Sequence, residues 1–596
     1  MVLSTIDWVL IISFFIISLF IGLVVSRKAG SSSQEFFLSG RNMPWWLLGV
    51  SMVATTFSAD TPNLVTDIVR KDGVSGNWVW WAFLLTGMLT VFVYAKLWRR
   101  SEVLTDLEFY ELRYSGKNAA FLRGFRAIYL GVFFNIMIMA TVSLAAIKIG
   151  GVMLGLEPWQ TLLFASIVTV IYSSLGGLRG VLITDFFQFV IAMTGTVWAA
   201  NVILDLPQVN GLSNLLSHES VVGKLSFVPD FSDTETFITL LIIPLAVQWW
   251  SVWYPGAEPG GGGYIAQRML SAKSEKHAIG ATLFFNAAHY ALRPWPWILI
   301  ALASLIVFPD IASLREAFPN VDPSVVKDDL AYSAMLTYLP SGLLGLVLAS
   351  LIAAFMSTIS THLNWGSSYV VYDFYKRFVN TEASDKELVN VGRISTVLLM
   401  VVASILALFL KNALQAFNIL LQIGAGTGLL FILRWFWWRV NAMSEITAMV
   451  VSFFMALYLQ LIHTGLGFEP LPNHYQLIIG IIVTTISWVS VALFTKPDDD
   501  EVLINFCKKV KAGGPGWARV TAKAKDRGET WMEGMGKWSV PREISLMIIG
   551  SLTIYAALFA TGLWIYGEYT SASITSAGAI VGGFLLMNGW NKLNAS

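Results

Sequence analysis

Cysteine and charged residues are both scarce in this chain of 596 residues. The single cysteine, Cys507, excludes an internal disulfide and any metal site built from several thiolates. Charged residues make up 13% of the chain, whereas a typical soluble domain has about 25%. So few charges cannot cover a large globule in water, but a surface that faces lipid needs none. The composition therefore indicates an integral membrane protein.

The residues that are abundant agree with this interpretation. Hydrophobic residues make up 56% of the chain, which has 24 Trp, 38 Phe and 48 Gly. Aromatic side chains collect at membrane interfaces, and glycine lets helices in a bilayer approach closely. The formal net charge of +1 gives no electrostatic attraction to nucleic acid, which we do not expect as a partner. The first apolar stretch lacks a basic segment before it and carries Asp7, so we expect a retained helix rather than a cleaved signal peptide.

Apolar runs long enough to cross the hydrocarbon core, about 20 residues each, recur along the chain. They predict an all-α polytopic membrane protein with 13–15 transmembrane helices, of which the last is weak because its centre is rich in small residues. The candidate spans lie near residues 6–25, 44–66, 76–98, 124–150, 158–176, 180–204, 234–255, 277–308, 340–372, 390–411, 414–438, 444–466, 474–495, 542–567 and 573–590.

Basic residues are distributed unevenly between the loops. If the N-terminus lies outside, the loops that face the cytoplasm contain most of the 39 lysines and arginines, and the outer loops 205–233 and 309–330 are acidic. We therefore expect a multi-pass protein of the plasma (cell inner) membrane with its N-terminus outside. The polar stretch 496–541 is predicted to be a cytoplasmic loop containing a helix on the membrane surface, or alternatively a regulatory element.

Two of the candidate spans are interrupted. In the first, polar residues fill positions 54–63, where Pro62 removes a backbone donor and Asp60 would be costly in lipid. In the second, the segment 254–259 contains two prolines and runs into four glycines at 260–263. Irregular backbone at membrane depth persists only where it lines a cavity enclosed by protein. The alternative for the second segment is that the glycine-rich run lies outside the bilayer.

The two interruptions occupy matching positions. Five spans run from the first interruption to residue 204, and the second opens another five that end near residue 438. Because five is odd, the two sets enter the membrane from opposite sides, which predicts an inverted repeat with a transporter binding site at the breaks. We accordingly divide the chain into an N-terminal helix and loop (1–43), a transport core (44–438) and C-terminal helices with the loop 496–541 (439–596).

Polar residues inside the predicted spans leave several alternatives open. One face of the span at 340–372 could supply oxygens to a sodium ion or could simply favour close helix packing; its residues are Ala354, Ser357, Thr358, Ser360 and Thr361. Asp185 is either a solvated end residue or the anionic ligand of an ion.

Asn286, His289 and Arg293 share one face of the span at 277–308. An arginine so deep in the membrane needs a partner. It either forms a structural pair with Asp60 or Glu258, lines a solute pocket and favours an anionic solute, or lies nearer an interface than the span boundaries suggest.

Four motifs occur in order along the chain: FFLSGR at 36–41 with PWW at 44–46, YSSLGGL at 172–178 with TDFFQ at 184–188, QRMLSAKS at 267–274, and AFMST at 354–358. In these segments the chain resembles the sodium/solute symporter family, which includes sodium-coupled sugar, proline and sialic acid carriers. The motifs extend over roughly 36–375, and the five-plus-five order extends the resemblance to about residue 438.

The resemblance implies a LeuT-like core, Na⁺ as the coupling ion and no organic cofactor. It implies a first sodium site formed by the carbonyl groups of Ala54, Phe57 and Ala354 and the hydroxyl groups of Ser357 and Thr358. Some family members hold a second sodium ion with an aspartate and two further hydroxyls, which Asp185, Ser360 and Thr361 match. By position, Asp60, Thr61, Gln248 and His289 would contact the solute, and Arg293 completes the predicted substrate-binding set.

The expected function is sodium-driven import of a small polar solute (a sugar, sugar acid or other carboxylate) by alternating access, with two sodium ions per solute and a functional monomer. Leu84 and Gly87 stand where the sugar carriers have polar residues, and this departure and the glycine-rich insertion at 256–263 weaken the case for a simple sugar. The alternatives are a transporter-like membrane sensor and a sodium-coupled amino acid carrier. An enzyme is not expected, because His289 and one distant cysteine supply neither an activated nucleophile nor a metal cluster.

Overall fold

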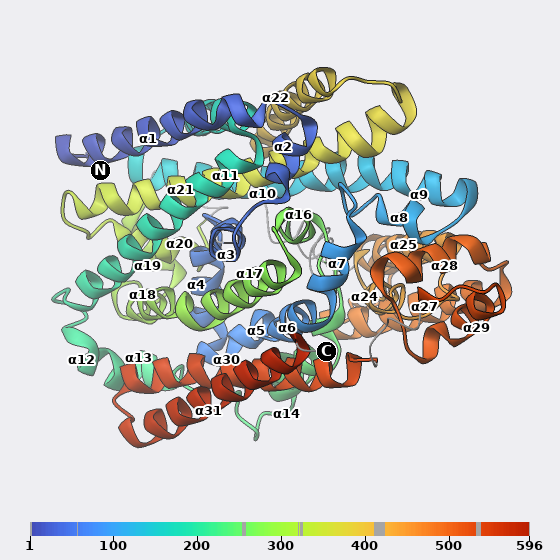
Figure 1. The fold of residues 1–596 in the computed structure, drawn as a ribbon. Helices are drawn as coiled ribbons and strands as arrows, with labels where there is room; N and C mark the ends of the chain where they lie inside the picture. The colour runs from blue at the N-terminus through green and yellow to red at the C-terminus, as the bar shows by residue number, and fades with distance from the viewer. Residues whose placement is uncertain are drawn as a thin grey trace.

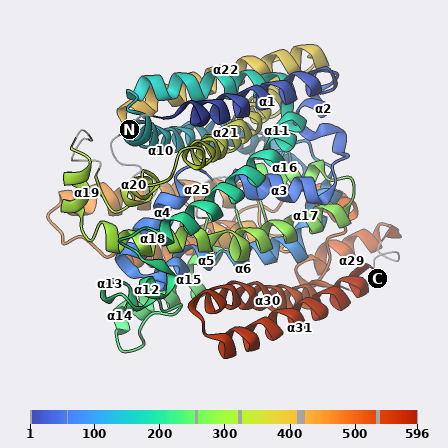
Figure 2. The same ribbon diagram turned by 90° about the vertical axis from the view of Figure 1, so that its left-hand side faces the viewer.

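The computed structural model describes residues 3–56, 58–252, 258–319, 321, 326–410, 423–531 and 538–594. Within these ranges the chain is helical apart from turns, loops and one isolated bridge between Met43 and Ala272. Long helices lie alongside one another in two roughly perpendicular views (Figures 1 and 2). The predicted all-α polytopic architecture is confirmed.

Eleven helical segments among the described residues are long and apolar enough to cross a membrane. They are α1 (Thr5–Ala29), η2 to α7 (Val74–Ser101), α9 to α10 (Gly116–Leu154), α11 (Pro158–Leu204), α17 to α18 (Glu275–Val307), α21 to η8 (Leu343–Val379), α22 (Asp385–Phe409), α25 with most of η9 (Ala442–Gln460), α27 (Asn473–Phe494), α30 (Val540–Tyr566) and α31 (Tyr569–Asn594). Two shorter apolar segments are α3 (Trp45–Thr55) and the run from α14 to η6 (Thr234–Trp250).

Helix α11 contains two of the predicted spans, because the chain folds back on itself at Gly177. This residue has non-helical angles, φ 52° and ψ −158°. A Cβ atom on Gly180 would lie 3.9 Å from the carbonyl oxygen of Tyr172, whereas eight residues of a straight helix rise about 12 Å. A Cβ on Gly177 would also meet the Phe36 carbonyl oxygen at 2.6 Å. Glycine therefore permits both the reversal and the close contact.

The predicted spans map onto this architecture. The reversal at Gly177 accounts for the predicted spans at 158–176 and 180–204. The two shorter segments, α3 and the run from α14 to η6, belong to the two interrupted spans at 44–66 and 234–255. The span near 414–438 lies partly outside the described residues, and its described part contains α24 (Gly428–Leu433). The weak last span forms α31, which packs beside α30 at one edge of the molecule (Figure 1).

The polar stretch 496–541 folds against the end of the helical core. Its helices α28 (Asp500–Val510) and α29 (Ala518–Asp526) flank the short η10 (Pro515–Trp517). The Trp517 indole nitrogen donates a hydrogen bond to the Trp435 carbonyl oxygen at 2.9 Å, and the buried Cys507 lies on α28. We call the described part of this stretch the folded cap; its location in the cytoplasm and its contact with the membrane surface stay predictions.

Short helices connect the spans. They are α2 (Ser33–Leu38), α8 (Phe109–Arg113), α12 (Gly211–Ser217), α13 (Glu219–Val222), α19 (Ile311–Ala317), α20 (Leu330–Leu336) and α26 (His463–Gly465).

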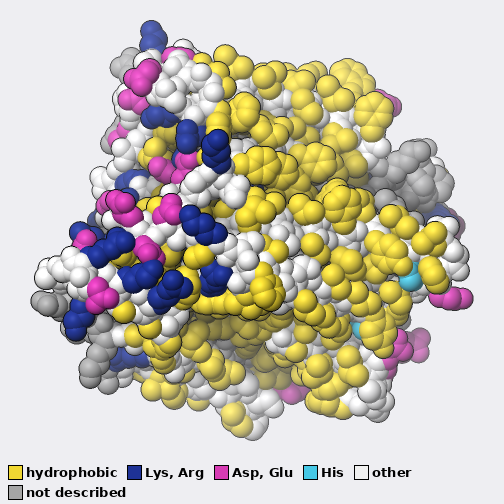
Figure 3. Space-filling model, turned by 90° about the vertical axis from the view of Figure 1, so that its right-hand side faces the viewer, with side chains coloured by type: hydrophobic (Ala, Val, Ile, Leu, Met, Phe, Trp, Pro, Cys, Tyr) yellow, Lys and Arg dark blue, Asp and Glu magenta, His cyan; other side chains and the backbone are white. Residues whose placement is uncertain are grey.

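The surface carries the polarity of a membrane protein. In Figure 3 lysines and arginines gather at one margin of the face, and hydrophobic side chains cover most of the remainder. Asp7, by contrast, is buried: its Oδ1 accepts hydrogen bonds from the backbone nitrogens of Gly342 and Gly345 at 2.7 and 2.8 Å. The Asp7 carboxylate on α1 therefore caps backbone donors at the start of α21 and links the two helices through hydrogen bonds.

Candidate ion and solute sites

The first predicted break is present. Helix α3 ends at Thr55 and α4 (Thr61–Asp72) begins six residues later. Pro62 lies in the first turn of α4, where its missing N–H costs nothing, because the first-turn donors have no helical partner. Phe57, predicted to supply a carbonyl group to the first sodium site, lies outside the described residues.

The second predicted break is also present. The run ends at η6 (Gln248–Trp250), and α16 begins at Gly263 and ends at Ser271. Gly260 and Gly261 have φ angles of 91° and 84°, a region that favours glycine. The segment is held by an ion pair of 2.8 Å between Glu258 and Arg126.

The polar face of α21 meets the end of α3. All five of its predicted residues are buried. The Thr358 hydroxyl donates a hydrogen bond of 2.9 Å to the carbonyl oxygen of Thr55, at the last turn of α3. Ala54, one residue before, and Ala354, one turn earlier on α21, are each 2% exposed. The structure therefore places Thr358, one of the residues predicted for the first sodium site, against the residue that follows Ala54.

Asp185 lies in a buried polar cluster. Its Oδ1 accepts a hydrogen bond of 2.7 Å from the Ser357 hydroxyl, and its Oδ2 accepts one of 2.5 Å from the Ser51 hydroxyl. The carboxyl group is 0% exposed. The alternative of a solvated end residue is therefore wrong.

Arg268, which the sequence analysis did not assign to a site, completes this cluster. Its Nη2 lies 3.8 Å from Asp185 Oδ2 and donates a hydrogen bond of 2.7 Å to the Thr361 hydroxyl. The guanidinium thus bridges two of the residues predicted for the second sodium site. The third, Ser360, donates its hydroxyl proton to the Ser357 carbonyl oxygen at 3.1 Å. We call Asp185, Ser51, Ser357, Thr361 and Arg268 the Asp185 cluster.

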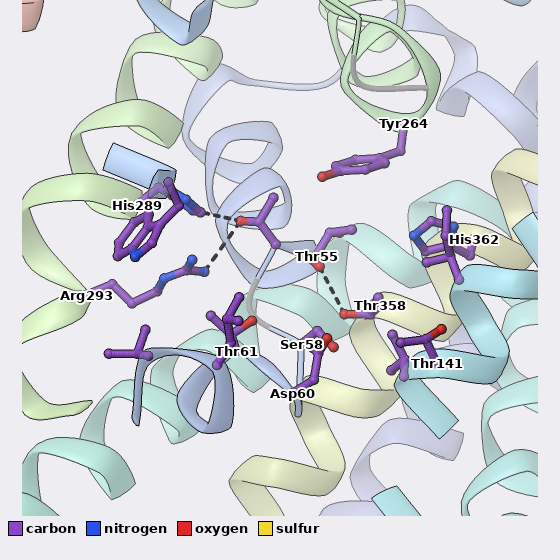
Figure 4. A pocket seen from close by; sticks show the side chains of 16 residues that line it. Thr55, Ser58, Asp60, Thr61, Thr141, Tyr264, His289, Arg293, Thr358 and His362 are labelled. Carbon is purple, nitrogen blue, oxygen red and sulfur yellow. Dashed lines mark hydrogen bonds between the residues drawn. The ribbon is translucent and has the colours of Figure 1, made fainter. Parts of the chain in front are cut away.

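A cavity of about 190 Å³ lies beside the first break. Segments far apart in the sequence supply its walls (Figure 4). They contribute Thr55, Thr56, Ser58, Asp60, Thr61, Leu64, Val65, Trp80, Ile138, Thr141, Val142, Tyr264, His289, Arg293, Thr358 and His362. Because Thr55 and Thr358 also form the contact between α3 and α21, the solute-sized cavity and the predicted first sodium site share a wall.

His289 and Arg293 lie at one side of the cavity (Figure 4), and both contact Thr56. His289 Nδ1 lies 3.1 Å from the Thr56 hydroxyl oxygen, and Arg293 Nη1 donates to the same oxygen at 3.4 Å and to the Val53 carbonyl oxygen at 3.3 Å. Arg293 is 1% exposed, so protein encloses its side chain, and Glu258 pairs with Arg126 instead.

The structure separates the predicted solute contacts into two groups. Asp60, Thr61, His289 and Arg293 line the cavity. Gln248, in the second interrupted segment, does not: its amide group donates a hydrogen bond of 2.7 Å to the Val79 carbonyl oxygen.

Other cavity residues were missed by the sequence analysis, among them Trp80, Thr141, Tyr264 and His362. For His362 the sequence did contain a signal: it lies one turn after Thr358, so the two residues share a helix face. Its Nδ1 lies 2.6 Å from the Asn135 side-chain oxygen. Trp80 stands edge-on to His289 with ring centroids 5.7 Å apart, and nothing in its own sequence neighbourhood marks it.

Two broken helices, a cavity at the first break and a contiguous set of hydroxyl and carbonyl oxygens define an ion-coupled secondary transporter. The chain matches the Sodium:solute symporter family over residues 36–452 and belongs to that family. It is therefore a sodium-coupled solute symporter and not an enzyme.

Its relatives include carriers of several solutes. The chain is 26% identical over 516 residues to the sodium/glucose cotransporter of Vibrio parahaemolyticus, with 84% of this chain and 92% of that protein covered. It is 23% identical over 467 residues to the sodium/sialic acid symporter SiaT of Proteus mirabilis, with 76% and 89% covered. The solved structure of a Na⁺-coupled sialic acid symporter matches with a TM-score of 0.65 at 20% identity, covering 83% of this chain and 99% of that one. This last match shows a shared LeuT-like fold.

Proposed function

We propose that the protein imports a small polar organic solute, most suitably a sugar acid or another carboxylate, by alternating access with two sodium ions per solute. The observation that carries this proposal is the wall shared by the cavity and the α3–α21 contact, which contains Thr55 and Thr358. An ion bound at this wall would hold the broken helix against α21 and complete the solute pocket. Because coupling is reciprocal, the solute should tighten sodium binding by the same factor.

The first sodium ion would lie between the end of α3 and α21. Its ligands would be the carbonyl groups of Ala54, Phe57 and Ala354 and the hydroxyl groups of Ser357 and Thr358. A sodium ion sheds its water only where several oxygens replace it. A hydroxyl that donates its proton still has lone pairs for a cation, so the bond from Ser357 to Asp185 is compatible with this role.

The second sodium ion would use Asp185, Ser360 and Thr361. In this structure the Arg268 guanidinium lies between Asp185 and Thr361. Two cations beside one buried carboxylate would repel each other strongly. We therefore assign the second ion to a state in which α16 has withdrawn Arg268 from the cluster.

The expected driving force follows from the charge moved. One charge that crosses ~100 mV contributes about 2.3 kcal/mol. Two sodium ions with a neutral solute would contribute about 4.6 kcal/mol, on the order of a thousandfold accumulation before the chemical gradient is added. A monoanionic solute would halve the electrical part.

The preference for a carboxylate is supported by the polar groups of the cavity. Arg293 and His289 supply the nitrogen-bearing groups on one side, whereas Leu84 and Gly87 are absent from its lining. A Cβ on Gly87 would lie within 1.7 Å of the Asn286 side-chain oxygen, so this position is filled by a neighbouring helix. A sodium-coupled amino acid carrier is the second candidate, because Asp60 in the same cavity could receive an ammonium group.

The remaining proposals concern topology and assembly. We propose the plasma (cell inner) membrane with the N-terminus outside, a functional monomer, and a transport core at 44–438 between the N-terminal helix (1–43) and the C-terminal helices (439–596). Cysteine-accessibility labelling from each side of intact cells would test the orientation.

The test of the function is uptake by proteoliposomes that contain the purified protein. A thermal-shift screen of sugars, sugar acids, amino acids and other carboxylates, with and without sodium, selects the solutes. We expect uptake of a carboxylate down a sodium gradient and background uptake when potassium replaces sodium. Equal uptake in potassium would contradict sodium coupling, and sodium-dependent binding without uptake would favour the membrane sensor.

A further inference from the structure

A second cavity, beside the folded cap, shares no lining residue with the solute cavity. It has a volume of about 630 Å³. Three elements form its walls: the end of α7 (Ala95–Ser101), the start of α17 (Glu275–Ala287) and the last turn of α28. Helix α7 packs against both of the others. The cavity therefore lies at the junction between the transport core and the polar stretch 496–541.

The walls carry an excess of positive charge. Arg100 and Glu275 neutralise each other through two hydrogen bonds of 2.9 Å. The charges that remain are those of Arg99, Lys276 and Lys509 against that of Glu102. Neither lysine forms an ion pair within the part of the chain that the structure describes.

One of these cations is held in place by the fold. The Nε of Arg99 donates a hydrogen bond of 2.7 Å to the Ala272 carbonyl oxygen, which fixes the guanidinium at the wall. An arginine held in this way has less side-chain freedom to lose when it binds an anion. Burial, together with the positive charge of Arg99 beside it, lowers the pKa of the neighbouring Arg41.

We propose that this cavity binds a compact phosphoryl anion, carried either by the headgroup of an anionic phospholipid or by a free phosphorylated metabolite. Lys276 and Lys509 stand on different walls, so one anion between them would join α17 to α28. The Ser274 hydroxyl lines the same wall as Lys276. Charge-assisted bonds from arginine and lysine to phosphoryl oxygens are among the strong hydrogen bonds of proteins.

The position of the cavity connects it to the transport core. Residues 271–273 pair with the segment before α3: Met43 N donates to the Ser271 carbonyl oxygen, and Lys273 N donates to the Met43 carbonyl oxygen, each at 3.1 Å. The same segment follows α16, which carries Arg268 of the Asp185 cluster. A ligand at Lys276 would therefore act on the corner between α16 and α17 without touching the solute pocket. This inference does not depend on which solute is carried.

The experiment uses the full-length protein, stripped of lipid in a neutral detergent. Isothermal titration measures the binding of pyrophosphate, dihexanoyl phosphatidylglycerol and dihexanoyl phosphatidylcholine at low ionic strength. The cavity variant is Lys276→Gln with Lys509→Gln. The matched control is Lys508→Gln with Lys511→Gln, which removes the same charge from residues absent from the cavity lining. Sodium-dependent thermal stabilisation shows that each variant is folded.

We expect saturable binding that weakens at least tenfold in the cavity variant and is unchanged in the control. Tighter binding of pyrophosphate would identify a free phosphoryl ligand, and tighter binding of phosphatidylglycerol would identify a lipid headgroup. The proposal is overturned if neither anion binds saturably, if both double variants weaken binding equally, or if phosphatidylcholine binds as well as phosphatidylglycerol.

Discussion

Helix α3 contributes Ser51 to the Asp185 cluster and Thr55 to the solute cavity, but the two regions use their polar groups differently. In the cluster, Ser51, Ser357 and Arg268 direct their donors at Asp185 or at one another, and all four side chains are fully buried. In the cavity, a few polar groups stand among aromatic and aliphatic walls. A buried charge must be partnered by the protein itself, whereas a binding cavity must leave some polar groups for the ligand.

This comparison predicts the largest effect for Arg268→Gln. The substitution leaves the Asp185 carboxylate buried without its cation, which typically costs about 3–5 kcal/mol. We expect the free energy of unfolding in sodium-free buffer to fall by about that amount, measured by chemical denaturation in detergent. The double variant Asp185→Asn with Arg268→Gln should recover most of the loss, because neither charge remains.

Sodium sharpens this test. If Asp185 belongs to a second sodium site, the ion can take the place of the missing guanidinium, and sodium should stabilise Arg268→Gln more than it stabilises the wild type. A variant as stable as wild type without sodium would contradict the ion-pair argument. Equal stabilisation of both proteins by sodium would count against the second site.

The second largest effect is expected on the cavity side, for Arg293→Gln. Losing a hydrogen bond to a charged group costs about 1.5–3 kcal/mol. The affinity for a carboxylate solute should therefore fall roughly 10–150-fold, measured by isothermal titration in sodium. Arg315→Gln, on the exposed helix α19, is the matched control. Unchanged affinity would exclude a solute contact, and loss of folded protein would favour a structural role for Arg293.

Thr358 belongs to the wall that the solute cavity shares with the predicted first sodium site, so its substitution should act on sodium. Thr358→Ala removes one hydroxyl, a loss of about 1–1.5 kcal/mol. The sodium concentration for half-maximal uptake should rise about tenfold. Thr358→Ser retains the hydroxyl group and should stay near wild type. If the sodium dependence of Thr358→Ala equals that of wild type, the first sodium assignment fails.

The smallest effect is expected for Gln248→Ala. Its amide group bonds to the Val79 carbonyl oxygen outside the cavity, so solute affinity should change less than twofold, whereas Trp80→Ala should weaken it clearly. Solute binding by the two purified variants, measured side by side, makes the comparison. A tenfold loss for Gln248→Ala would show that this residue reaches the solute in another conformation.

Local properties of the chain were predictable from the sequence. Hydropathy located the spans, and Pro62 and the glycines at 260–263 located the breaks, because a missing N–H and a positive φ act within a few residues. Helical periodicity placed Ser357, Thr358 and Thr361 on one face. The four motifs indicated the sodium/solute symporter family, and the match over residues 36–452 shows that the chain belongs to it.

Contacts between distant elements were decided only by the tertiary structure. Arg268 and Asp185 are far apart in the sequence, and neither residue's neighbourhood shows that they meet. Trp80, Tyr264 and His362 reach one cavity from three separate elements, while Gln248 faces away from it. A helix with a given amphipathic face can pack against its neighbours in several ways. Which arrangement forms depends on the packing of all the helices around it. Sequence therefore determined which helices form and where they break, and packing decided which of their side chains meet.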